Sequence, residues 1–139
     1  MKITKDFPGL KDIGGAYEFQ GDLISDAGIE IDLGDKWLKV TGVIRAVLDI
    51  KAGGDIRAGG DIRAGWGIRA GGGIIAGLSI RCRKVLSWRF NLFAGTATWK
   101  LPTAEDQIVE ALRLEGDGEI RHGVFRALTA ESGERGIGD

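Results

Sequence analysis

Large aliphatic residues recur at every sixth position through the middle of the chain. From Ile44 the sequence reads IRAVLD, IKAGGD, IRAGGD, IRAGWG, IRAGGG, IIAGLS and IRCRKV, and Leu86 and Leu92 keep the same phase. Side chains alternate between the two faces of an extended strand, so the first and third residues of each hexad point the same way. The pattern predicts short strands with an inward aliphatic residue, an outward residue and an inward alanine, joined by corners.

The repeat extends toward the N-terminus. Leu38 keeps the phase, and beyond a three-residue insertion at 35–37 further units begin at Tyr17, Leu23 and Ile29. A single hexad cannot bury its inner face, so the units must coil and each turn must pair with the next. Two or three hexads per turn fit this period. We favour three, and the sequence therefore predicts a mainly β fold, a short hexapeptide-repeat β-solenoid.

The flanks of the array predict small caps within a single domain. The open ends of a solenoid expose unpaired strands that invite aggregation, so both ends need cover. We assign the segments as an N-terminal cap at 1–16, the solenoid at 17–97, a C-terminal cap at 98–131 and a frayed tail at 132–139 of the domain 1–139. Residues 105–114 are good helix formers, but the Gly-Asp-Gly turn at 116–118 separates two apolar segments. We favour a C-terminal hairpin over a helix.

Glycine dominates the composition. The chain has 24 glycines in 139 residues but only 2 prolines, and the corners of the coil give glycine a periodic backbone role. One cysteine and one histidine exclude an intramolecular disulfide and a Cys/His zinc cluster within one chain. The sequence has no secretory signal pattern and no long apolar run. We therefore expect a cytoplasmic protein that does not contact a membrane.

The hexads resemble those of left-handed β-helix proteins, and more closely those of small Ile-x-Ala-Gly repeat proteins of phages and prophages. This resemblance covers residues 17–97. The larger hexapeptide family includes many coenzyme-A-dependent acyltransferases. This chain departs from them, because alanine stands where they prefer a large aliphatic residue, their long catalytic loop is missing, and His122 lies outside the repeats. The resemblance implies the fold and a phage context, and it gives little support to acyl transfer.

The outward second position carries a basic ladder. The net charge is +7 over residues 44–100, against −3 over 1–43 and −5 over 101–139. Beyond Lys39, the candidate residues for binding phosphates are Arg45, Lys51, Arg57, Arg63, Arg69 and Arg81. The alternative is a solvated surface in which these cations pair with the corner aspartates Asp49, Asp55 and Asp61. Three hexads per turn would also divide the ladder among three faces.

Apolar residues interrupt the polar surface at a few positions. Trp66 and Leu78 stand at corners, and Ile75 and Phe93 occupy the outward position that is elsewhere basic. These four residues are candidates for a subunit interface, which would make the protein a homo-oligomer. The alternative is that the C-terminal segment covers some of them, together with the nearby tryptophans at 88 and 99.

Other chemistry has weaker support in the sequence. The Gly-Gly-Asp units differ from calcium-binding β-rolls, which repeat every nine residues with aspartate in each. The Gly-Trp-Gly at 65–67 is a corner, since no helix follows it. Cys82 occupies an inward alanine position, which favours a buried small residue over a nucleophile served by His122. We expect no catalytic residue, no metal site and no cofactor.

Together these features predict a non-catalytic binding protein. The phage resemblance suggests an inhibitor of host defence that acts in the host cytoplasm. It would either block an effector, as anti-CRISPR proteins do, or sequester a nucleotide signal. The expected partner is a host protein, a protein–nucleic-acid complex or an anionic nucleotide. The alternatives are a structural solenoid of a phage particle, which should form trimers or filaments, and an acyltransferase that would lose activity on His122→Ala.

Overall fold

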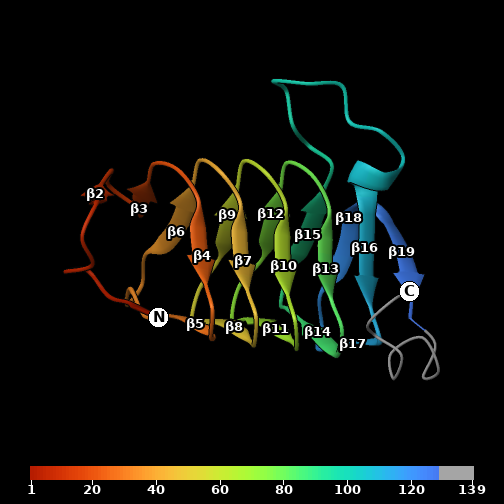
Figure 1. The fold of residues 1–139 in the computed structure, drawn as a ribbon, viewed down its shortest axis with the longest axis horizontal. Coiled ribbons are helices and arrows are strands. Elements are labelled where there is room, and N and C mark those ends of the chain that lie inside the picture. The colour runs from red at the N-terminus through yellow and green to blue at the C-terminus, as the bar shows by residue number, and fades with distance from the viewer. Residues whose placement is uncertain (129–139) are drawn as a thin grey trace.

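The computed structural model describes residues 1–128 and shows a β-solenoid of about six turns with three sheets of stacked parallel strands (Figure 1). Each turn contributes one strand to each sheet, and sheet B has one additional strand. Sheet A comprises β1 (Lys2–Ile3), β5 (Ile29–Ile31), β8 (Ile50–Ala52), β11 (Ile68–Ala70), β14 (Val85–Ser87) and β17 (Arg113–Glu115). Sheet B comprises β2 (Leu10–Asp12), β3 (Ala16–Phe19), β6 (Trp37–Val40), β9 (Ile56–Ala58), β12 (Ile74–Ala76), β15 (Asn91–Ala94) and β18 (Glu119–His122). Its additional strand is β2, which pairs antiparallel with β3. Sheet C comprises β4 (Leu23–Ser25), β7 (Ile44–Ala46), β10 (Ile62–Ala64), β13 (Ile80–Cys82), β16 (Ile108–Ala111) and β19 (Val124–Ala127).

The register confirms three hexads per turn. Ile62 pairs with Ile44 on one side and Ile80 on the other, so identical positions of every third hexad are stacked. All three isoleucines are fully buried, and Ala64 is only 6% exposed. The inward first and third positions thus form the core predicted from the repeat. The narrow alanine side chain keeps the tube slim, which suits a core built from strands of three residues.

Glycine is needed where one corner lies directly on the next. The N–H of Gly65 donates to the carbonyl of Ala46 at 3.0 Å, and a Cβ at Gly65 would overlap the carbonyl oxygen of Val47. Its φ is not positive, so the requirement is for close approach rather than for a left-handed backbone. Stacking of the corners therefore accounts for part of the glycine enrichment.

Aspartates at the corners tie one turn to the next. The Asp49 carboxylate accepts a hydrogen bond from the N–H of Gly67, and Asp55 accepts one from Gly73, both at 2.8 Å and across 18 residues. These bonds satisfy backbone donors that a corner would otherwise leave open. Two of the three predicted partners of the arginines thus serve the backbone, although Asp55 also lies 4.0 Å from Arg57.

Two insertions leave the stack at corners, and parallel pairing of the rungs resumes after each of them. The first, at 35–37, lengthens one corner, so that Leu23 pairs with Ile44 across 21 residues. The second is the loop at 95–107, which projects from the solenoid between β15 and β16 and ends in the short 3-10 helix η1 (Glu105–Gln107) (Figure 1). Beyond this loop the rungs resume, with Ile80 paired to Val109.

The C-terminal segment forms strands, as expected, with no helix beyond η1 among the described residues. On either side of the turn at 116–118, β17 pairs in parallel with β14 and β18 with β15. Parallel rungs therefore continue beyond 17–97, up to β19, and β1 pairs in parallel with β5 at the other end. The buried Trp88 indole donates to the carbonyl of Glu119 at 3.3 Å, so this tryptophan is covered by the C-terminal segment. The tail expected at 132–139 lies outside the described residues.

Candidate functional site

The three-sided coil divides the basic ladder among its faces. Arg45, Arg63 and Arg81 lie on adjacent rungs of sheet C, Lys51 and Arg69 lie on sheet A, and Arg57 lies on sheet B with Lys39. Neighbouring rungs of a sheet are about 4.8 Å apart, so only residues on the same face act together. Sheet C holds three of the candidate cations and has the largest local cluster of arginines.

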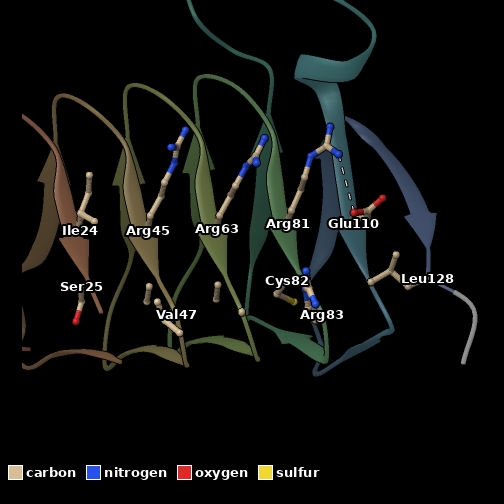
Figure 2. Close-up of a pocket in the computed structure, with 13 residues that line it drawn as sticks. Ile24, Ser25, Arg45, Val47, Arg63, Arg81, Cys82, Arg83, Glu110 and Leu128 are labelled. Atoms are coloured by element: carbon tan, nitrogen blue, oxygen red, sulfur yellow. Dashed lines mark ion pairs between the residues drawn. The ribbon is translucent and has the colours of Figure 1, made fainter. Parts of the chain in front are cut away.

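The arginines of sheet C border a groove of about 460 Å³. Figure 2 shows the three arginine side chains in a row, pointing the same way from β7, β10 and β13. The groove is lined by Ile24, Ser25, Arg45, Ala46, Val47, Arg63, Ala64, Gly65, Arg81, Cys82, Arg83, Glu110 and Leu128. One side of the groove therefore carries the row of arginines, and the other combines small and aliphatic residues with Arg83.

Arg45 and Arg63 share a single carboxylate. Asp61 Oδ2 lies 3.3 Å from Nη2 of Arg45 and 3.3 Å from Nε of Arg63. The Asp61 side chain is only 9% exposed, whereas the two arginine side chains are 48% and 52% exposed. Two guanidinium groups against one buried carboxylate leave one positive charge in excess. Asp61 orients both arginines while most of their N–H donors remain available to a ligand.

Arg81 is more fully neutralised than its neighbours. Its guanidinium lies 2.8 Å from Glu105 Oε2 and 3.9 Å from Glu110 Oε1, and Arg126 contacts the same two carboxylates at 3.2 and 2.7 Å. Hydrogen bonds from Arg81 and Arg126 lower the pKa of Glu105, and those to Glu110 and Glu105 raise the pKa of Arg126. This closed network of four charges fastens η1 to sheet C, so Arg81 has less capacity for an added anion.

Arg83 supplies another cation at the corner between sheets C and A. Its side chain is exposed, and no ion pair involving it is found within residues 1–128. The repeat pattern did not single out Arg83, because it stands at a corner rather than at the outward strand position. Figure 2 shows it on the same groove as Val47 and Cys82, on the side away from the tips of the row of arginines.

The remaining basic candidates have separate surroundings. Lys51 and Arg69 border a second groove on sheet A that also contains Glu30 and Asp32, so its charge is mixed. Arg57 stacks on the ring of Trp37, with 3.9 Å between the guanidinium carbon and the ring centroid. Trp37 belongs to the insertion at 35–37, which thereby anchors one of the candidate cations to the scaffold.

The four candidate interface residues occupy three different places. Ile75 and Phe93 are paired neighbours on sheet B, both half-buried. Leu78 is half-buried at the corner between sheets B and C, whereas Trp66 is 53% exposed at the corner between sheets C and A. Sequence reasoning missed Leu101, which is 89% exposed on the 95–107 loop. No repeat position marks that residue, because the loop lies outside the hexad phase.

Cys82 and His122, the two groups considered for nucleophilic chemistry, both have structural surroundings. Cys82 is buried, and desolvation raises the pKa of its thiol to about 12, which disfavours the reactive thiolate. His122 Nδ1 lies 2.6 Å from the carbonyl oxygen of Ala94 on the neighbouring rung of sheet B. Within residues 1–128 there is no cluster of three or more His, Cys, Asp or Glu arranged to hold a metal ion.

Comparison of the chain with protein-family models, with curated proteins and with solved structures gives no match. In the described part of the chain, no helix has the length and apolar character required to cross a membrane. By its fold and its sheet C groove, the protein is a repeat β-solenoid with a basic groove on one face.

Proposed function

We propose that the protein is a non-catalytic binding protein that holds a phosphate-bearing nucleotide in the sheet C groove. The observation that carries the proposal is the arrangement of Arg45 and Arg63, which share the buried Asp61 and leave one positive charge in excess. Guanidinium groups bind phosphate oxygens through paired N–H donors, and here two of them lie on adjacent rungs. Arg83 adds a third cation to the same groove.

The apolar side of the groove supports a nucleotide over a simple anion. Val47 is 58% exposed on the side away from the arginine tips, and the alanines Ala46 and Ala64, only 8% and 6% exposed, also line the groove. A nucleobase or ribose can pack on such a surface while its phosphates contact the guanidinium groups. The strands that carry Arg45 and Arg63 are hydrogen-bonded to a neighbouring strand on both sides. The backbone therefore loses little conformational entropy when a ligand binds.

The biological part of the proposal rests on the resemblance to phage and prophage repeat proteins. In that setting a nucleotide-binding solenoid would sequester a signal of host defence in the host cytoplasm. The groove favours sequestration over the blocking of an effector, since it suits a small anion with an apolar part. A structural role in a phage particle would not require a charge-biased groove of this kind.

Isothermal titration calorimetry against a panel of mononucleotides and cyclic dinucleotides tests the proposal. We expect binding by at least one of them, and a loss of about tenfold or more in affinity on Arg45→Gln or Arg63→Gln, since a hydrogen bond to a charged group contributes about 1.5–3 kcal/mol. Glutamine keeps a donor for Asp61 and so limits damage to the fold. The control replaces both Lys51 and Arg69 with glutamine. It removes two positive charges, more than either single variant, but on sheet A.

The control variant should retain its affinity within about twofold, because both residues lie on sheet A. If this variant loses as much affinity as the sheet C variants, the binding is general charge attraction and the groove assignment is wrong. Lack of binding by every nucleotide in the panel would reject the proposal outright.

A second candidate function, the blocking of a protein effector, is favoured by the loop at 95–107. Trp99 and Leu101 are 64% and 89% exposed on it, and the Trp99 indole donates to the carbonyl of Gly59 at 3.1 Å. Large apolar side chains on a braced loop are typical anchors of protein interfaces. Leu101→Ala should then weaken inhibition of the effector in a reconstituted assay while nucleotide binding is unchanged.

A further inference from the structure

The two ends of the solenoid differ in how they are covered. At the N-terminal end, Phe7 and Leu10 pack against the core, and the Phe7 ring meets that of Phe19 edge-on with 6.0 Å between centroids. Under this cover the first inward residues of sheets A and C, Ile3 and Leu23, are 0% and 2% exposed. The segment before β3 therefore closes this end of the tube.

The opposite end has no comparable cover within residues 1–128. Its last inward side chains are Leu114, Ile120 and Phe125, which pair with the fully buried inward residues of the preceding rung. Leu114 and Ile120 are half-buried, and Phe125 is 36% exposed. Figure 1 shows the strands that carry them, β17, β18 and β19, together at the end remote from β2 and β3. The tube therefore ends here in an apolar surface that no residue within 1–128 covers.

The same end presents three strand edges. β17, β18 and β19 are each the last strand of their sheet in the described chain, so one row of N–H and C=O groups on each faces outward. Such edges readily pair with another strand, and proteins usually block them with a cap, a bulge or charged side chains. The register of β18 against β15 is irregular between Leu92 and Phe93, so β17 and β19 are the regular edges. The apolar floor beside these two edges is the surface that an occupant would cover.

The charges around this rim permit a second copy of the chain. The last rung carries three arginines and three carboxylates, namely Arg113, Arg121, Arg126, Glu115, Asp117 and Glu119. Because the signs are balanced and interspersed, two identical ends can approach without net repulsion. A rim of one sign would have prevented this approach.

The composition of residues 129–139 is poorly suited to cover this surface. The 11 residues at 129–139, TAESGERGIGD, include four charged residues and three glycines, and Ile137 is the only large aliphatic residue. A segment of this composition offers little apolar area to cover three large inward side chains. An identical end, by contrast, brings a matching floor of Leu114, Ile120 and Phe125.

We propose that two copies of the chain associate through their C-terminal ends, tail to tail, about a two-fold axis perpendicular to the solenoid axis. Such an axis reverses the strand direction, so the edge strands of one copy meet those of the other antiparallel. The N-terminal end also has edge strands, β1, β2 and β4, but Phe7 and Leu10 cover its apolar core, so it offers no matching apolar floor and we expect assembly to stop at the dimer. This interface does not include the four candidate interface residues that interrupt the repeats, Trp66, Ile75, Leu78 and Phe93.

Size-exclusion chromatography with light scattering, at protein concentrations from 1 to 100 µM (about the range where a modest dimer dissociates), tests this inference on the full chain. We expect a species of twice the 14.8 kDa chain mass. Phe125→Asp should yield monomer with an unchanged far-ultraviolet circular dichroism spectrum, because this side chain is already partly exposed. Trp66→Asp, which also charges an exposed aromatic position, is the control and should remain dimeric.

Hydrogen exchange gives a second readout that does not depend on a substitution. Amides of β19 should become more protected as the protein concentration rises, whereas those of β4, the other edge strand of sheet C, should not. A full-length monomer at the highest concentration overturns the inference. So does a dimer that persists in Phe125→Asp, or dimerisation that appears only when residues 129–139 are deleted, since the tail would then be the occupant.

Discussion

The stacked corners allow a sharp test of the packing, because two glycines occupy the same position of the repeat in different surroundings. Gly65 and Gly53 each follow the inward alanine of a hexad, and each N–H donates to a carbonyl of the preceding turn, at 3.0 and 3.3 Å. A Cβ at Gly65 would overlap the carbonyl oxygen of Val47, whereas a Cβ at Gly53 would have nothing within 4 Å. Alanine at these two positions therefore isolates the effect of rung-to-rung contact.

The expected magnitudes follow from these contacts. Gly65→Ala must push the corner away from the turn below, and overpacking of this kind costs about 1–3 kcal/mol. Weakening the hydrogen bond of the Gly65 N–H adds about 1 kcal/mol, for a total of about 2–4 kcal/mol. Gly53→Ala should instead stabilise the fold by about 0.4–1 kcal/mol, because it reduces the entropy of the unfolded chain without a clash.

Urea unfolding followed by circular dichroism measures both changes in the free energy of unfolding. We expect the two variants to differ in sign and to be separated by at least about 2 kcal/mol, well above the error of extrapolation for a small domain. Equal effects of the two substitutions would refute the reasoning, since they share a repeat position and differ only in what lies beneath them.

Three further predictions concern other contacts. Cys82, with its pKa raised to about 12 by burial, should resist a thiol reagent at pH 8 and react on unfolding; rapid labelling of the folded chain would contradict its inward placement. The network around Glu105 should weaken in acid: its pKa is below the ordinary 4.5, so its contribution is complete above pH 4.5 and is lost as the pH falls through the lowered value. The side-chain N–H resonances of Arg81 and Arg126, which contact Glu105, should shift over that interval, and Glu105→Gln should reduce the shift. Gly118→Ala should displace the Trp88 indole and destabilise the fold by about 1–3 kcal/mol in urea unfolding, whereas Gly15→Ala, where a Cβ has open space, should have no comparable effect.

The solenoid was predictable because its repeat is almost uniform. Isoleucine in the first position and alanine in the third define the inward face, and the insertion at 35–37 was visible as a break in phase. The structure places these residues as predicted, from the buried Ile44 to the buried Leu92. The alternation of inward and outward side chains in a three-residue strand follows from local strand geometry alone, so it can be predicted from the sequence.

The C-terminal rungs were harder to predict because local propensity and tertiary pairing disagree there. Residues 105–114 include many good helix formers, yet β16 and β17 form because the edges of β13 and β14 offer partners. The length of the 95–107 loop also removes the phase that would have marked these strands. The pairing of Arg81 with Glu105 and Glu110 depends on this loop, so no sequence pattern indicated that Arg81 is neutralised.

The roles of the corner aspartates also depend on tertiary structure. Asp49, Asp55 and Asp61 stand in equivalent places of the hexad, but only Asp61 bridges two arginines. Which carboxylate meets which cation depends on the corner of the prism at which each one lies. A single repeat unit does not carry that information.

The hydrogen bonds of Asp49 and Asp55 to the next turn bear on how nearly identical hexads find their correct neighbours during folding. A chain with the same motif six residues apart can pair one hexad out of place and still bury isoleucine against isoleucine. Such a slip would move these aspartates away from Gly67 and Gly73, and it would place Trp37 against a partner other than Arg57. The irregular residues of the array thus identify individual turns and select one alignment among several that the core alone would accept.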